Sequence, residues 1–324
     1  MAAHSHHHQH TGHDHSGHDR VGHHHAHGQP PAPGAAATRA FALGTLVNLG
    51  FTAIEAGYGF LTGSLALLSD ALHNLGDALG LALSWGAAWL AQRPASARRT
   101  YGYGRATLLA PLINSLLLVA GSGALGWEAL RRLASPPTVD PWPIITVAAI
   151  GIAINFGSAL LFRHGHAHDI NQRGAYLHLM TDAAVSLAVV LGGIAMLQFG
   201  WRWLDPLLAL VVGGVVIWSG WGLLRDSLDL TLDAVPRGLD RQAVQTFLTQ
   251  QSGVAAVHHV HIWALSSREI ALTAHLVRPG DADHDAFIAD LSAQLRERFG
   301  IGHATLQIER GHDPTHSACG EDHC

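Results

Sequence analysis

Two heptapeptides in this chain place a histidine and an aspartate four residues apart within apolar surroundings. They are LHNLGDA at 72–78 and LHLMTDA at 177–183. On a helix, residues four apart share one face and lie about 5–6 Å apart at Cβ. If the two pairs face each other, they present two imidazole nitrogens and two carboxylate oxygens, a donor set that suits tetrahedral Zn²⁺. We therefore predict a metal site made of His73, Asp77, His178 and Asp182.

The charges of this site agree with a divalent cation, because two carboxylates leave the loaded site neutral. Uncompensated aspartates at bilayer depth are costly, and such residues are functional candidates by default. A structural hydrogen bond between His and Asp would explain a single pair. Two matching pairs on separate helices are harder to explain in that way. Nitrogen and oxygen donors also suit Co²⁺ or Ni²⁺, so the donor set alone does not fix the metal.

The composition indicates a membrane protein. Of the 324 residues, 48% are hydrophobic and only 13% are charged, whereas soluble domains carry about 25% charged residues. The formal net charge of −5 gives no indication of a nucleic-acid partner. The two cysteines lie within the last six residues and cannot form a disulfide framework. Histidine is the anomaly, with 26 in the chain and 12 of them between His4 and His27.

Hydropathy and composition divide the chain into four segments. Residues 1–37 are rich in His, Gly, Asp and Pro, and we expect a disordered cytoplasmic tail. Residues 38–232 alternate long apolar runs with short polar breaks, 236–311 have the pattern of a cytoplasmic domain, and 312–324 form a second polar tail. A membrane-spanning helix needs about 20 mainly apolar residues. Six runs meet this length, at 40–62, 66–91, 105–130, 143–162, 174–199 and 205–224.

The arginine distribution predicts the orientation of these runs. Arginines gather in the breaks 91–105 and 163–173 and flank the ends of the segment, whereas the opposite breaks hold only Arg131, Arg132 and Arg202. By the positive-inside rule, the runs form an all-α bundle of six transmembrane helices with both termini in the cytoplasm. We expect an integral membrane protein in contact with lipid, of a bacterial inner membrane.

The segment 236–311 has the element order αββαβ. Helical spacing is present at 239–251 and 284–299, and β-rich runs occupy 254–265, 270–278 and 304–310. This order predicts a small two-layer α+β domain of ferredoxin-like or metallochaperone-like type.

Further polar residues lie inside the apolar runs. Asp70 precedes His73 by one helical turn and is a proton carrier, an entry-path charge or an N-terminal helix cap. The others either line an ion or proton pathway or form interhelical hydrogen bonds, and they are Asn48, Glu55, Asn114 and Asp205.

Longer motifs surround the paired histidines and aspartates. The bundle contains SLALLSDALHNLGDALGLAL at 64–83, RRTYGYGRATLLAPLINSLLL at 98–118 and RGAYLHLMTDAAVSLAVV at 173–190, and the C-terminal segment contains VHHVHIWALSSREIALTAHLV at 257–277 and LQIE at 306–309. In this order they resemble the cation diffusion facilitator family, over about residues 38–311, and within it the bacterial zinc-exporter branch. The resemblance implies a homodimer that exports Zn²⁺ from the cytoplasm in exchange for protons through the four-residue site. It also implies a preference for Zn²⁺, because members with Asp at position 73 accept Cd²⁺ more readily.

The resemblance implies a second Zn²⁺ site in the C-terminal domain, with His258, His275 and Glu309 as ligands. Gln307 stands where some relatives carry another histidine, which leaves the ligand set incomplete. Strand alternation puts His258 on the face of Val260 and Ile262 and its histidine neighbours on the other face. Weaker candidates for completing the site are His259, His261, His312, Cys319 and Cys324; the tail cysteines are otherwise reduced thiols without a fixed partner.

Two other segments bear on metal binding. The N-terminal tail and RHGHAHD at 163–169 are expected to chelate metal loosely near the entrance. The segment 92–104 contains no His, Asp or Cys, so we predict no metal site there.

Ligand protonation supplies a mechanism. Metal binds neutral His and ionised Asp, so metal loading releases protons and protonation releases metal, and the reference pKa of His near 6.5 suits this exchange. We expect a Zn²⁺/H⁺ antiporter that works by alternating access, not an enzyme, with Co²⁺, Ni²⁺ and Cd²⁺ as further candidate ions. The alternatives are an intramembrane zinc hydrolase, which would keep an open coordination position, and a non-transporting metal sensor, which would not need six helices.

Overall fold

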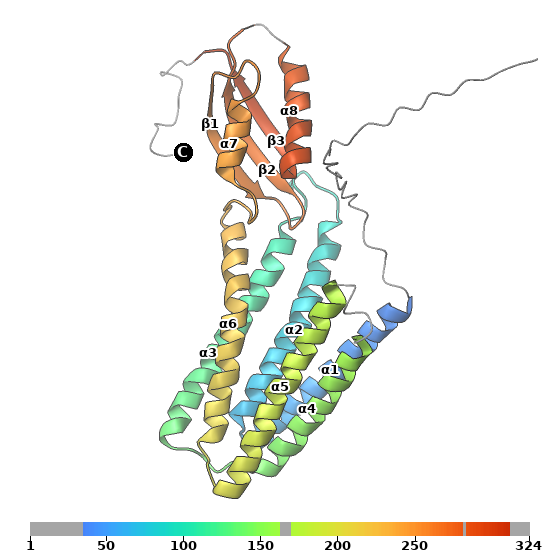
Figure 1. Cartoon of the computed structure of the whole chain (residues 1–324), viewed down its shortest axis with the longest axis vertical. Helices are drawn as coiled ribbons and strands as arrows, with labels where there is room; N and C mark the ends of the chain where they lie inside the picture. The colour runs from blue at the N-terminus through green and yellow to red at the C-terminus, as the bar shows by residue number, and fades with distance from the viewer. Residues whose placement is uncertain (1–34, 163–169, 281–282, 312–324) are drawn as a thin grey trace, which may run out of the picture.

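The computed structural model describes residues 35–162, 170–280 and 283–311. Within these ranges six long helices are followed by a smaller domain of helices and strands, which stands at one end of the helical bundle (Figure 1). The bundle consists of α1 (Ala35–Thr62), α2 (Leu65–Ala91), α3 (Ala106–Ala134), α4 (Pro141–Phe162), α5 (Ile170–Phe199) and α6 (Leu204–Thr231). The C-terminal domain consists of α7 (Arg241–Thr249), β1 (Ala256–Ala264), β2 (Ile270–Val277), α8 (His284–Phe299) and β3 (Ile301–Glu309).

Each of the six apolar runs forms one helix, but only four of the described helices are long and apolar enough to cross a membrane by length and composition alone. These four are α3, α4, α5 and α6. In α2, a polar stretch with buried Asp70 and Asn74 and partly buried His73 and Asp77 interrupts the apolar sequence. The prediction of six crossing helices is therefore confirmed for four of them by this criterion.

The bundle packs around α2, which contacts α1, α3, α5 and α6, while α4 runs along α5 and α3 runs along α6. One apolar cluster joins α1, α2, α4 and α5 and includes Phe51, Leu67 and Val189. Small residues allow close helix contacts, as at Gly76, where an added Cβ would lie 2.2 Å from a Leu118 methyl carbon. Many large apolar side chains point outwards instead, as a lipid-exposed surface requires. α2 is thus held on several sides, which fixes the face that carries His73.

Asp205, at the start of α6, anchors the beginning of α2. Its carboxylate accepts hydrogen bonds from the Ser64 hydroxyl and from the backbone N–H groups of Leu65 and Ala66. The side chain of Asp205 is 1% exposed, and Ser64 is the N-cap of α2. These contacts are those of an interhelical cap, one of the two roles expected for Asp205 from the sequence.

Replacing Asp205 by alanine is expected to lower the free energy of unfolding by at least about 2 kcal/mol, because three buried donors lose their acceptor. Asp205→Asn keeps one acceptor oxygen and is expected to lose less. Thermal unfolding of the detergent-solubilised protein, followed by circular dichroism, measures the difference. Asp140→Ala is the matched control, since exposed Asp140 accepts a single hydrogen bond among the described residues, from the Trp142 N–H at the start of α4. An equal loss of unfolding free energy in Asp205→Ala and Asp140→Ala would contradict the anchoring role of Asp205.

The C-terminal domain follows the predicted order αββαβ. Its sheet has the order β1-β2-β3, with β1 antiparallel and β3 parallel to β2. Leu248, Leu272, Leu276, Leu291 and Leu295 belong to one buried core between the sheet and the two helices. Asp side chains cap both helices at their N-termini, and a left-handed glycine at position 300 ends α8. Local capping and alternating apolar residues therefore account for the element boundaries.

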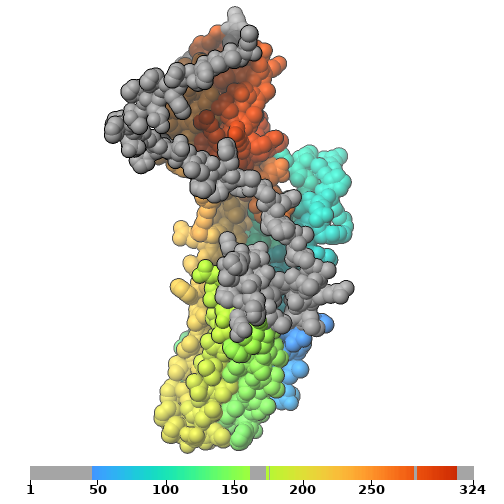
Figure 2. Space-filling model, turned by 45° about the vertical axis from the view of Figure 1, so that its right-hand side comes forward, coloured from blue at the N-terminus to red at the C-terminus, as the bar shows by residue number. Residues whose placement is uncertain are grey.

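The loop between α2 and α3, together with the first turn of α3, touches the C-terminal domain (Figure 2). The Ser267 N–H donates to the Thr107 hydroxyl at 2.9 Å, and the Tyr101 and His303 rings pack edge to face with centroids 5.6 Å apart. Arg105 forms a 2.8 Å ion pair with Asp233 in the segment that follows α6. The two parts of the chain are thus connected by α6 and by this loop.

Candidate metal centres

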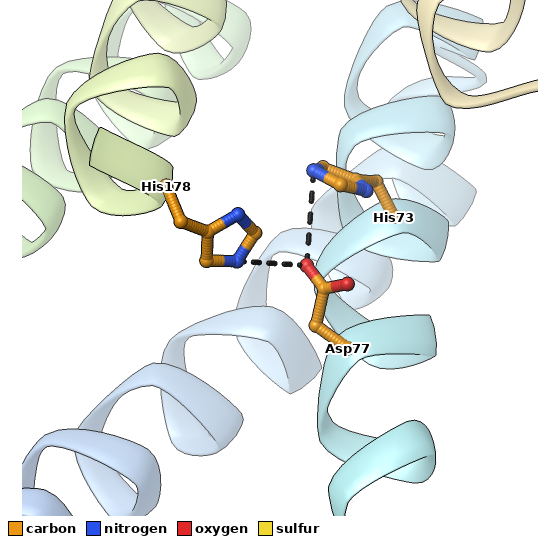
Figure 3. A group of neighbouring side chains, drawn as sticks. All are labelled: His73, Asp77 and His178. Atoms are coloured by element: carbon orange, nitrogen blue, oxygen red, sulfur yellow. Dashed lines mark ion pairs between the residues drawn. The ribbon is translucent and has the colours of Figure 1, made fainter. Parts of the chain in front are cut away.

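The first candidate centre joins α2 and α5 (Figure 3). His73 and Asp77 project from one face of α2 towards His178, which comes from α5. His73 Nε2 lies 3.7 Å from Asp77 Oδ2 and 3.3 Å from Asp182 Oδ1. His178 Nε2 lies 3.2 Å from Asp77 Oδ2 and 3.6 Å from Asp182 Oδ2. Histidine and aspartate therefore alternate around a closed ring of four side chains.

The spacing of this ring suits a small tetrahedral cation. Zinc–nitrogen and zinc–oxygen bonds of about 2.0–2.2 Å place neighbouring ligand atoms about 3.3–3.6 Å apart in a tetrahedron. The four N···O distances of 3.2, 3.3, 3.6 and 3.7 Å fall close to this range. One ligand atom each from His73, Asp77 and His178 lies within 4.8 Å of the other two. These three side chains are thus preorganised, whereas Asp182, which contacts His73 through Oδ1 and His178 through Oδ2, would have to turn one oxygen towards an ion.

Burial differs between the four side chains. Asp182 is 1% exposed, His73 19%, Asp77 34% and His178 46%. A buried carboxylate such as Asp182 needs a cationic or hydrogen-bonding partner. The two histidine nitrogens, or an ion between them, supply that partner. The more exposed Asp77 and His178 leave one side of the ring open for exchange.

A second layer of buried polar groups lies beside this ring. The Ser186 hydroxyl donates to Asp70 Oδ2 at 3.2 Å, and Asn74 Nδ2 donates to Glu55 Oε2 at 3.4 Å. Glu55 is 0% exposed, and Asp70 and Asn74 are each 1% exposed. The N-cap of α2 is Ser64, and Asp70 lies six residues further along the helix. The helix-cap interpretation of Asp70 is therefore wrong.

The remaining polar candidates lie apart from the ring contacts. Asn114 of α3 packs against Gly80 of α2. Asn48 is half-buried, and its carbonyl accepts the Thr52 hydroxyl. Neither side chain contacts the ring in the described structure, so a pathway role for them stays a prediction.

The second candidate centre lies on the sheet of the C-terminal domain. Glu309 at the end of β3 contacts two histidines, with Oε2 3.0 Å from His258 Nε2 and Oε1 2.9 Å from His275 Nδ1. Ligand atoms of these three residues lie within 4.8 Å of one another. Gln307 Nε2 donates to Glu309 Oε1 at 3.3 Å and so supports the carboxylate. The structure therefore brings together the three residues proposed from the resemblance.

A β-bulge changes the expected facing of the histidines in β1. His258 pairs with His275, but His261 pairs with Thr273, so β1 contains one extra residue between these pairs. His259 absorbs it with a positive φ of 49°. His258 consequently shares a face with its pair partner and not with Val260 and Ile262, and the expected alternation is wrong here.

The same bulge brings His259 to the cluster. Its ring centroid lies 5.1 Å from that of His258 and 5.0 Å from that of His275. The His261 ring lies further out, 6.4 Å from His259. His259 therefore becomes the nearest described candidate for a fourth ligand. The tail candidates His312, Cys319 and Cys324 lie outside the described residues.

Comparison with known proteins identifies the two domains. Residues 42–230 match the cation efflux transmembrane domain, and residues 236–311 match the cytoplasmic domain of cation efflux proteins. The chain belongs to the cation diffusion facilitator family. It is therefore an integral membrane protein whose C-terminal domain corresponds to the cytoplasmic domain of that family.

Several characterised relatives are similar over most of their length. The metal cation efflux system protein CzcD of Cupriavidus metallidurans is 36% identical over 252 residues, 78% of this chain and 80% of the relative. The zinc transporter ZitB of Escherichia coli K12 is 34% identical over 272 residues, 83% of this chain and 86% of the relative. The cadmium, cobalt and zinc/H⁺–K⁺ antiporter of Bacillus subtilis 168 is 35% identical over 268 residues, 80% of this chain and 85% of the relative.

Two contributors to the centres of this cation diffusion facilitator were missed from the sequence. Ser186 lies four residues after Asp182, and Asn74 directly follows His73. Extending the four-residue spacing by one more turn along α5 would have found Ser186, because it continues the ligand face. No comparable signal marks Asn74, since its side chain points to α1.

Proposed function

We propose that this cation diffusion facilitator exports Zn²⁺ from the cytoplasm in exchange for protons. The observation that carries the proposal is the alternating ring of His73, Asp77, His178 and Asp182, with N···O distances of 3.2–3.7 Å. Relatives about 35% identical are a zinc transporter and an antiporter of cadmium, cobalt and zinc. Four donors from two helices suit a cation cargo that must be enclosed and then released.

The exchange with protons follows from the chemistry of these donors. Zn²⁺ binds neutral imidazole and ionised carboxylate, so a proton arriving at either group competes with the metal. With a reference pKa near 6.5, the two histidines can change charge within the physiological range. Coupling arises if the metal-loaded and protonated forms favour opposite facing states of the bundle. The metal range extends to Co²⁺, Ni²⁺ and Cd²⁺, because the donor set does not exclude these ions.

All six helices of the bundle cross the membrane in this proposal. At 1.5 Å per residue, the 28 residues of α1 and the 27 of α2 extend about 40 Å, more than the about 30 Å of hydrocarbon. Their polar residues face the bundle interior, which accounts for their lower hydropathy. The excess of arginine in the breaks 91–105 and 163–173 supports a cytoplasmic location of both termini in a bacterial cell. The working unit is a homodimer.

The centre at His258, His275 and Glu309 binds Zn²⁺ as a regulatory ligand in this proposal. Glu309 contacts β1 and β2, and Ser267 in the turn between these two strands donates to Thr107 at the start of α3 in the bundle. A metal ion there would hold the sheet in one form. His259 is the fourth ligand that we favour, because its ring lies about as close to the cluster as the others do.

An intramembrane zinc hydrolase is the rival for the bundle site, and it makes a different demand. A catalytic zinc keeps an open position for water beside three protein ligands and a general base. Asp182 lies beside the three ligand atoms of His73, Asp77 and His178 and can supply a fourth, which favours enclosure over hydrolysis. A metal sensor would bind without moving the ion across the membrane.

Zinc flux in proteoliposomes tests the proposal. We expect external Zn²⁺ to enter vesicles that contain the protein, followed by a trapped fluorescent zinc indicator. Because protons leave the vesicle as zinc enters, an acidic vesicle interior is expected to accelerate the flux. Dissipation of this pH gradient by an ionophore is expected to slow it. Empty vesicles are the control. Zinc binding without flux would move the function to a sensor or a hydrolase, and flux indifferent to the gradient would remove the proton exchange.

A further inference from the structure

Two carboxyl groups outside the metal ring contact each other in the bundle interior. The side chains of Glu55 of α1 and Asp70 of α2 lie within hydrogen-bonding reach of each other. Both are almost completely buried, at 0% and 1% exposure. The other oxygen of each is held by a neutral donor, Glu55 Oε2 by Asn74 and Asp70 Oδ2 by Ser186.

One oxygen of each carboxyl group has no donor among the described residues. Glu55 Oε1 and Asp70 Oδ1 are buried and find no N–H or O–H partner within the part of the chain that the structure describes. The Asn74 amide, which is aimed at Glu55, also keeps an unpartnered buried oxygen. Two ionised carboxylates cannot hydrogen-bond to each other, because neither carries a hydrogen. Their contact therefore requires a proton between them.

The charge balance leads to the same requirement. His73 and Asp182 are the other titratable side chains that act electrostatically on this pair. In the ion-free ring with neutral histidines, the charges of Asp77 and Asp182 are themselves uncompensated, so the ring offers no counterion to Glu55 and Asp70. Two unpaired buried carboxylates are strongly unfavourable, and closely spaced acid pairs hold one proton between them.

We propose that Glu55 and Asp70 form a proton-binding site separate from the four metal ligands. One carboxyl group carries the proton and donates it in a hydrogen bond to the other, and Asn74 and Ser186 hold the outer oxygens. The proton can leave to water, which leaves two carboxylates. No other described carboxylate pair in the bundle combines this burial with direct contact.

The site is close enough to the metal ring to respond to it. Asp70 lies three residues before His73, a rise of about 4.5 Å along α2. A bound Zn²⁺ favours ionisation of nearby acids, so metal entry would expel the proton, and proton return would favour metal release. This coupling rests on the proposed exchange of zinc for protons, whereas the proton site itself does not.

Proton release during zinc binding tests the site. Zinc is titrated into the solubilised full chain in buffers of different ionisation enthalpy, and calorimetry gives both the affinity and the number of protons released. Glu55→Gln and Asp70→Asn imitate the protonated groups in shape. We expect each variant to bind Zn²⁺ within about tenfold of the wild-type affinity and to release about one proton fewer per ion at the ring.

Glu128→Gln is the matched control, because it makes the same chemical change at a half-exposed glutamate of α3 that pairs with Arg131 and Arg132. Zinc binding to histidines outside the bundle, including the histidine-rich tails, contributes equally to the proton release of all variants. The differences in proton release between variants therefore report on Glu55 and Asp70. Unchanged proton release in both variants would overturn the proposal. Loss of ring binding in a correctly folded variant would also overturn it, because the two residues would then act on the metal directly.

Infrared difference spectroscopy on the wild type tests the same site without mutation. Zinc addition is expected to remove a band of protonated carboxyl groups, and a spectrum without that loss contradicts the proposal. The outcome is independent of flux. If wild-type vesicles carry no zinc but the variants still release fewer protons, the transport function fails and the proton site stands.

Discussion

Replacing Asp182 by alanine is expected to lower zinc flux at least about 100-fold. Asp182 is the most buried of the four ring residues and contacts both histidines, at 3.3 and 3.6 Å. Even residues that only support a metal ligand change affinity or activity 10–100-fold when mutated, so the loss of a direct ligand should cost at least as much. Initial rates in proteoliposomes, with an imposed pH gradient, measure the effect.

The fold should survive this substitution. The partners of Asp182 in the ring are His73 and His178, which can stay neutral when the carboxylate is removed, so no opposite charge is left unpaired. Thr181→Ala is the matched control, since exposed Thr181 makes one side-chain hydrogen bond within the described structure, to the Leu177 carbonyl of its own helix. The control is expected to keep wild-type flux. If Asp182→Ala, eluting as a folded protein, carried zinc at the control rate, the pathway would lie outside this ring.

The geometry of the ring could be predicted because its rules are local. A helix places residues four apart on one face, so the two sequence motifs already define two donor pairs. Bilayer thickness sets the length of the apolar runs, and each of the six predicted runs coincides with a helix. That the pairs face each other was inferred from the chemistry of zinc, and the N···O distances of 3.2–3.7 Å agree with it.

The parts that escaped prediction depend on contacts between distant segments. Asp205 accepts hydrogen bonds from residues about 140 positions earlier, and no local pattern reports such a partner. The bulge at His259 adds a single residue to β1, which reverses the facing of His258 while leaving the alternating pattern of the sequence unchanged. Both features follow from how elements pair, which one strand or helix does not encode by itself.

The second large effect is expected in the C-terminal domain, where Glu309→Ala should abolish zinc-dependent protection of the sheet. Glu309 contacts both His258 and His275, at 3.0 and 2.9 Å. A ligand at about 100 times its Kd stabilises the folded form by about 2.7 kcal/mol, which slows amide exchange about 100-fold where exchange needs unfolding of the domain. Hydrogen–deuterium exchange of the full chain, read in peptides from β1, β2 and β3, separates this response from metal bound to the bundle or to the tails.

Without zinc, the rate of amide hydrogen–deuterium exchange should change little in Glu309→Ala. The carboxylate and both histidines are partly exposed, so their mutual contacts contribute little to stability. Glu297→Ala is the matched control, since Glu297 is an exposed glutamate of α8 in the same domain. It is expected to keep the full zinc response. Protection that persisted in Glu309→Ala would show that His259 or other donors hold the ion without the carboxylate. In that case the bulge, and not the end of β3, would define the metal site of this domain.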